Sequence, residues 1–156
     1  MIVLGIDPGT TRAGYGVLKK ESGKLIFLEG GLLSSPKTNK QGDRLLALEV
    51  GLQKIIKSTK PDVAGIERLY LIKNKKTAVR VAEARGGIIK TLSAKKVPIE
   101  EFSPSSVKLA VTGSGTADKR AVAKMVSLIL HIDTSKMLDD TTDALAIAIA
   151  TSSVHH

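Results

Sequence analysis

The sequence predicts a single α/β domain built on a mixed five-stranded sheet, with a three-strand meander, two parallel strands and flanking helices. Three observations predict this class. Three strand-length segments joined by short links open the chain, two further apolar segments alternate with helical patterns, and helical patterns end it. At 156 residues the chain can bury one core but not two full lobes, and no repeat or linker divides it.

The strands follow from apolar runs bounded by turn residues. Residues 2–6 form a continuous apolar run that stops at Asp7, Pro8 and Gly9, which is typical of a central strand entering a turn. Residues 13–20 and 24–33 are the next two strands, and their short link favours an antiparallel hairpin. The other two expected strands are residues 62–67 and 97–102.

The helices follow from apolar residues at helical spacing. The first extends from Asp43 until Pro61 interrupts the pattern. Four more are expected over residues 77–93, 104–111, 118–131 and 140–152, with Pro104 at a first helical position and Asp118 and Asp139 as N-caps. The helix over 77–93 is apolar around most of its circumference, so it should be buried on two sides, either within the domain or against a second subunit.

Composition limits the classes of binding partner and of site chemistry that fit this chain. Lys and Arg number 24 against 15 Asp and Glu, a net charge of +9 that favours nucleic acid. A membrane span is not expected, since no apolar run approaches the roughly 20 residues required. The absence of cysteine excludes disulfides, thiolate zinc sites and a cysteine nucleophile. The N-terminus does not resemble a signal peptide, so we expect a cytoplasmic protein. The single domain spans residues 1–156. We assign no role to the terminal His155 and His156, because a purification tag would leave the same two residues.

Four carboxylates stand at the ends of apolar segments. Asp7 follows the first strand, Glu67 follows the fourth, and Asp140 and Asp143 share a helical face. Each has an ordinary explanation alone: a turn residue, an ion pair with Arg68, or charges that favour a helix N-terminus. Together they would repel one another unless a cation intervenes. We therefore predict a magnesium-type site that hydrolyses phosphodiesters, and spacing leaves open whether Asp139 replaces Asp140.

Five motifs, in this order, resemble the RuvC family of bacterial Holliday-junction resolvases: GIDPGTTRAGYGV, AGIERLYLIKN, ARGGI, VKLAVTGSGTADKRAVAKMV and DDTTDALAIAIA. The resemblance implies a ribonuclease H-like fold and a homodimer that makes paired nicks in opposite strands of a four-way DNA junction during recombination and repair. It also implies two Mg²⁺ ions per active site, which Mn²⁺ can replace, and a branch-migration motor of the RuvA and RuvB type as a partner.

The same resemblance assigns residues. It implies that the catalytic metal ligands are Asp7, Glu67, Asp140 and Asp143, and so favours Asp140 over Asp139. It places Tyr70 at the family's junction-stacking aromatic and matches Lys108, Lys119 and Arg120 to basic positions. Nearby Lys73, Lys75, Lys76 and Arg80 offer phosphate contacts. The expected DNA-binding set is Tyr70, Lys75, Lys76, Lys108, Lys119 and Arg120.

Three other functions are compatible with parts of the sequence. DPGTTRAGYGV also resembles the phosphate-binding hairpin of sugar kinases and actin-like ATPases, but those proteins need a second lobe for which this chain has no room. A related ribonuclease H-like nuclease acting on RNA or an RNA:DNA hybrid is the closer alternative. A junction-binding module without catalysis is a third, and the complete set of four acids argues against it.

Overall fold

A computed structural model of the chain describes residues 1–9, 12–34, 40–69 and 75–155, with the side chains of Ser34 and Lys75 excluded. Five strands form one sheet in the order β3-β2-β1-β4-β5. Their bounds are β1 (Ile2–Asp7), β2 (Arg12–Glu21), β3 (Lys24–Ser34), β4 (Val63–Glu67) and β5 (Ile99–Phe102). The first three pair antiparallel, whereas β1 with β4 and β4 with β5 are parallel. The predicted meander and parallel pair are confirmed.

The last strand is shorter than predicted. It begins at Ile99 and not at Val97. The amide of Val97 instead donates to the carbonyl of Leu92 in the preceding helix at 3.0 Å. This hydrogen bond belongs to the C-terminal end of the helix, so the Val97 amide does not pair with a neighbouring strand.

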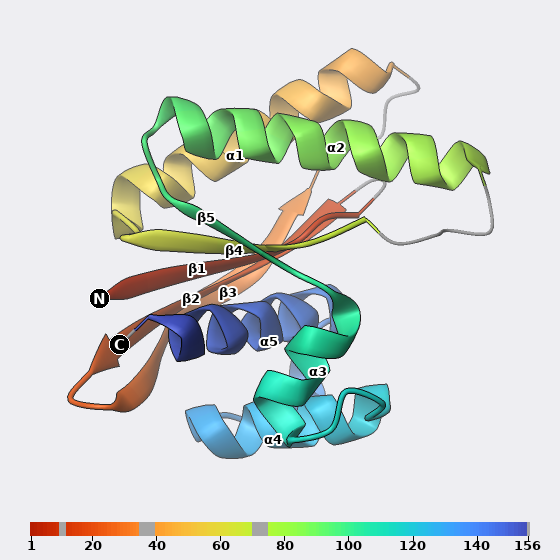
Figure 1. The fold of residues 1–156 in the computed structure, drawn as a ribbon. Helices are drawn as coiled ribbons and strands as arrows, with labels where there is room; N and C mark the ends of the chain where they lie inside the picture. The colour runs from red at the N-terminus through yellow and green to blue at the C-terminus, as the bar shows by residue number, and fades with distance from the viewer. Residues whose placement is uncertain (10–11, 35–39, 70–74, 156) are drawn as a thin grey trace.

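Helices cover both faces of the sheet (Figure 1). On one face lie α1 (Gln41–Thr59) and α2 (Lys75–Ala94). On the other lies α5 (Asp139–Val154), with α3 (Pro104–Thr112) and α4 (Lys119–Leu130) beyond it and a short 3₁₀ turn, η1 (Thr134–Lys136), between α4 and α5. Each of the five predicted helices is present, with ends that differ by a few residues. Within the described part of the chain, no helix has the length and apolarity needed to cross a membrane.

Two cores result, one on each face of the sheet. Alternate strand residues point to opposite faces, so Val3 and Val63 join the core under α5 while Leu4 and Ala64 join the core under α1 and α2. This alternation also determines which way the residues at the strand ends point, and those residues include two of the predicted acids.

Helix α5 lies unusually close to the sheet because glycines face it. A Cβ atom at Gly65 would lie 1.9 Å from Thr151 Oγ1, and one at Gly14 would lie 1.8 Å from the carbonyl oxygen of Asp140. Gly5 and Gly16 meet the same helix in the same way. Only residues without a side chain fit at these positions, so the N-terminal end of α5 is held against β1 and β2.

The helix ends and faces correct two expectations. Asp118 is an N-cap as predicted, since its Oδ1 accepts from the Ala121 amide at 2.8 Å. Asp139 is not an N-cap: Leu138 occupies that position and Asp139 is already helical. Helix α2 is buried on one side only, because Ala84 and Ile88 are in the core while Val79 is 57% exposed. Burial of its second side within the domain is therefore not observed.

Candidate active site

The first two acids leave neighbouring parallel strands at the same level. Residues Val3 to Ile6 of β1 pair with Val63 to Ile66 of β4, so Asp7 and Glu67 each come one residue after the last pair. Gly5 and Gly65 face α5, and two residues further along a strand the side chain returns to that face. Asp7 and Glu67 therefore both point towards α5.

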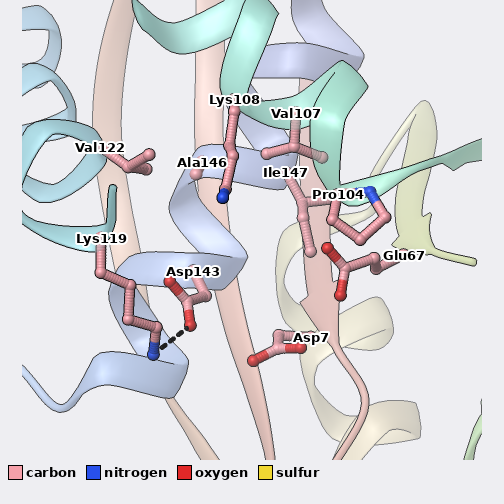
Figure 2. Close-up of a pocket in the computed structure, with 10 residues that line it drawn as sticks. All are labelled: Asp7, Glu67, Pro104, Val107, Lys108, Lys119, Val122, Asp143, Ala146 and Ile147. Atoms are coloured by element: carbon pink, nitrogen blue, oxygen red, sulfur yellow. Dashed lines mark ion pairs between the residues drawn. The ribbon is translucent and has the colours of Figure 1, made fainter. Parts of the chain in front are cut away.

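A pocket forms where these strand ends meet the helices. It is lined by Asp7, Glu67 and Asp143, by Lys108 of α3 and Lys119 of α4, and by the apolar side chains of Pro104, Val107, Val122, Ala146 and Ile147. Figure 2 shows the three carboxylates entering one space from β1, β4 and α5, with the two lysines at its border. Three distant segments thus bring three of the four predicted acids together.

Burial and mutual repulsion perturb these acids. The pKa of Asp7 is raised to about 7, chiefly because burial disfavours its charge and then because Asp143, Glu67 and Asp140 repel it. Burial also raises the pKa of Glu67 and that of Asp143. Burial, followed by repulsion among the acids, therefore disfavours the charged forms of these carboxyl groups.

Lys119 is the cation most closely tied to the acids. Its Nζ lies 3.0 Å from Asp143 Oδ2 and 3.6 Å from Asp139 Oδ2. The hydrogen bond to Asp143 raises the pKa of Lys119, so the side chain stays charged. Lys119, which the motifs predict for DNA binding, thus lies beside the acids, and Asp139 is accounted for as part of this exposed ion pair.

Asp140 is placed differently from the other acids. It does not line the pocket, and its Oδ2 lies 2.6 Å from Nε of Arg12 at the start of β2. The same oxygen is buried and accepts no directed hydrogen bond, so the contact is an ion pair. Sequence reasoning missed Arg12, because only the packing of β2 against α5 reveals that the two residues meet.

A second arginine, Arg85, binds the backbone of Glu67. Arg85 of α2 donates through Nε to the backbone carbonyl of Glu67 at 3.0 Å, and its guanidinium also pairs with the carboxylate of Glu101 on β5. Among the described residues Glu67 makes no ion pair with Arg68, so that ordinary explanation for Glu67 is not borne out. The ARGGI segment was noted in the sequence, but not this contact.

The other predicted DNA-binding residues are partly described. Lys108 lines the pocket, and Arg120 is exposed in the first turn of α4. Lys76 is exposed in the first turn of α2, and Arg80 is exposed one turn later. Tyr70 and Lys73, and the side chain of Lys75, lie outside the described residues.

The donor chemistry of the pocket fits a hard divalent cation. All of its candidate ligands are carboxylate oxygens, the donors that Mg²⁺ prefers, and there is no cysteine in the chain. In the ranges that the structure describes, however, no three acidic or histidine side chains already surround one point closely enough to ligate an ion.

The chain is similar to known proteins over nearly its whole length. The family model described as "Crossover junction endodeoxyribonuclease RuvC" matches residues 3–151. The chain is 44% identical to RuvC of Chloroflexus aggregans over 149 residues, covering 96% of this chain and 91% of the relative. It is 40% identical to RuvC of Petrotoga mobilis over 148 residues, covering 95% and 91%.

A solved structure is also similar. The structure of T. thermophilus RuvC in complex with a Holliday junction substrate superposes with a TM-score of 0.90 at 29% identity, covering 97% of this chain and 93% of that one. The ribonuclease H-like fold expected from the motifs is confirmed. The similarity extends over nearly the whole chain, and the acids occupy the strand and helix ends that the motifs predicted. This chain therefore belongs to the RuvC family of crossover junction endodeoxyribonucleases.

Proposed function

We propose that this chain cuts four-way DNA junctions at the acidic pocket, with Asp7, Glu67, Asp140 and Asp143 as the ligands of divalent metal. One observation carries the assignment of residues: acids from β1, β4 and α5 converge in one pocket that two lysines border and whose remaining lining residues are apolar. A cluster of partly buried carboxylates with raised pKa values is costly to maintain without a cation.

Divalent metal is used by nucleases of this family. We propose two Mg²⁺ ions per site, replaceable by Mn²⁺, which when bound would activate the attacking water and stabilise the leaving oxygen. The chain's own residues hold and orient the components. Asp7 and Glu67 project from the carboxyl ends of two paired strands, and Asp143 projects from a buried helix. Groups held on paired strands and a packed helix are suited to precise positioning of a ligand. Lys119 supplies a fixed positive charge beside Asp143.

The DNA substrate is supported by charge and by the relative that was solved with a Holliday junction. Lys108 and Lys119 border the pocket, and Arg120 is exposed at the start of α4, so phosphates of the cut strand would approach across these residues. We propose that Lys75 and Lys76 contact phosphates of the junction, from the family motif alone. The role of Tyr70 as a base-stacking residue at the junction centre stays a prediction from the family motif.

Paired nicks require two active sites, and we propose that a homodimer supplies them. The support is the exposed side of α2, where apolar Val79 faces outwards. A branch-migration motor of the RuvA and RuvB type is the partner that we propose for the dimer–junction complex, from the family resemblance alone.

The proposal is tested by cleavage of an end-labelled four-way junction beside linear duplex and RNA:DNA hybrid, with Mg²⁺ or EDTA. The parent should nick the junction only, in opposite strands and only with Mg²⁺. Glu67→Gln and Asp143→Asn should bind the junction without cutting it. Glu21→Gln and Asp133→Asn are matched controls, because they remove exposed acids away from the pocket.

Each alternative outcome has a distinct meaning. Cleavage of the hybrid in preference to the junction would favour the alternative nuclease class. Full activity in Glu67→Gln or Asp143→Asn would overturn the assignment of the pocket.

Junction affinity should also fall steeply with salt, because phosphate contacts release counterions.

A further inference from the structure

Arg12 and Asp140 form an ion pair between β2 and α5. Arg12 opens β2 and Asp140 lies in the first turn of α5, 128 positions later in the chain, yet Nε and Oδ2 are 2.6 Å apart. The Asp140 side chain is only 28% exposed, its Oδ2 is buried, and the Arg12 side chain is 50% exposed. A partly buried pair of this kind is screened less than a surface pair.

The backbone around Asp140 has little room to move. Its carbonyl oxygen lies where a Cβ atom at Gly14 would be, and the adjoining residues Thr141 and Thr142 are buried. A close-packed helix end of this kind resists displacement. Asp140 can therefore change its surroundings only through its side-chain torsions.

The pocket lacks this one acid. Asp7, Glu67 and Asp143 line it and Asp140 does not, although Asp140 is near enough to contribute to the raised pKa of Asp7. Lys119, which lines the pocket, pairs with Asp143, whereas Arg12, which does not line it, pairs with Asp140. The two acids of α5 are thus held by cations from two different elements.

We propose that Arg12 is a positioning residue of the metal site, which holds Asp140 outside the acidic pocket until the ion pair opens and the carboxylate turns towards the metal. This inference rests on the proposed role of Asp140 as a ligand. Arg12 and the divalent ion compete for the same carboxylate, so Arg12 lowers the affinity of the free protein for metal. It also limits the repulsion that a fourth acid would add to the pocket.

The test measures Mn²⁺ binding to the DNA-free protein by electron paramagnetic resonance or calorimetry. Arg12→Ala should bind Mn²⁺ roughly twofold to fivefold more tightly than the parent, the range expected for loss of one partly exposed ion pair. Arg12→Lys, which retains a cation, should stay close to the parent. Thermal unfolding in EDTA checks that each variant is folded.

Two controls separate a specific effect from a general change of charge. Lys19→Ala removes a cation from the same strand, where Lys19 pairs with Glu21 at 2.7 Å, and should leave Mn²⁺ affinity unchanged. In an Asp140→Asn background, Arg12→Ala should have no effect, because the carboxylate for which Arg12 competes is gone.

Unchanged or weaker binding in Arg12→Ala would overturn the inference, as would equal tightening in the Asp140→Asn background. If Asp140→Asn alters Mn²⁺ affinity while Arg12→Ala does not, only the role of Arg12 fails. If neither variant alters it, the assignment of Asp140 as a ligand fails as well, whereas cleavage by the Glu67 and Asp143 variants tests the rest of the pocket independently.

Discussion

Lys119 Nζ lies 3.0 Å from Asp143 Oδ2, so the first turn of α4 places a cation directly against the acid of α5 that lines the pocket. The contact joins two segments that the sequence had suggested for different roles, one for DNA binding and one for metal. A lysine in this position can neutralise Asp143 before the substrate binds. Once the substrate is bound, the same lysine can face a phosphate of the DNA.

We expect Lys119→Met to lower the rate of junction cleavage by about a hundredfold, because the variant loses a fixed positive charge where negative charge develops. Single-turnover cleavage with saturating enzyme measures this rate. Lys124→Met is the matched control, since Lys124 is exposed on the same helix and does not line the pocket. Equal rates for Lys119→Met and the parent would exclude this role.

We expect the metal-free protein to lose stability as the pH rises from about 4 to about 7. The folded pKa of Asp7 is raised from 3.8 to about 7, so over this interval the native state binds more protons than the unfolded state. The contribution is fully present below pH 3.8, falls through the interval and is constant above it. Raised pKa values at Glu67 and Asp143 act in the same direction.

Asp7→Asn should remove most of this dependence and exceed the parent in stability at pH 8, by about 2 to 4 kcal/mol. Urea denaturation in EDTA at pH 5 and pH 8 measures the difference. A stability gap between the two proteins that is the same at both pH values would contradict the predicted direction.

We expect Gly65→Ala to destabilise the fold by about 1 to 3 kcal/mol, because the added Cβ would lie 1.9 Å from Thr151 Oγ1 in a packed interface. Gly42→Ala is the control: Gly42 lies in α1 and a Cβ there meets nothing within 4 Å. That change should be neutral or slightly stabilising. Comparable losses in the two variants would mean that close packing of α5 is not the cause.

We expect Arg85→Ala to cost about 1 to 3 kcal/mol of stability and to slow cleavage with little change in junction affinity. The variant loses the hydrogen bond to the Glu67 carbonyl and the ion pair with Glu101, which together hold the end of β4. Lys90→Ala removes a more exposed ion pair on the same helix, with Glu49, and should do neither. Weaker junction binding with an unchanged cleavage rate would assign Arg85 to DNA contact instead.

Much of the fold could be predicted from local patterns. The apolar runs, their turn residues and the helical spacing identified the sheet, its meander and each helix, because period-two and period-3.6 burial leave direct traces in a sequence. The errors lie at element ends. Val97 donates to a helix carbonyl and Leu138 takes the N-cap position expected of Asp139, and both choices depend on hydrogen bonds that spacing does not specify.

The sequence by itself determined that Asp7 and Glu67 each follow a strand and that Asp143 lies in the first turns of a terminal helix, since apolar runs and burial period suffice for this. Only the tertiary structure decided which charges meet. Arg12 reaches Asp140 and Lys119 reaches both Asp139 and Asp143 because glycines on β1, β2 and β4 allow α5 to lie against the sheet. Side-chain contacts across such distances depend on how closely two elements pack, and the local sequence around either partner does not contain that information.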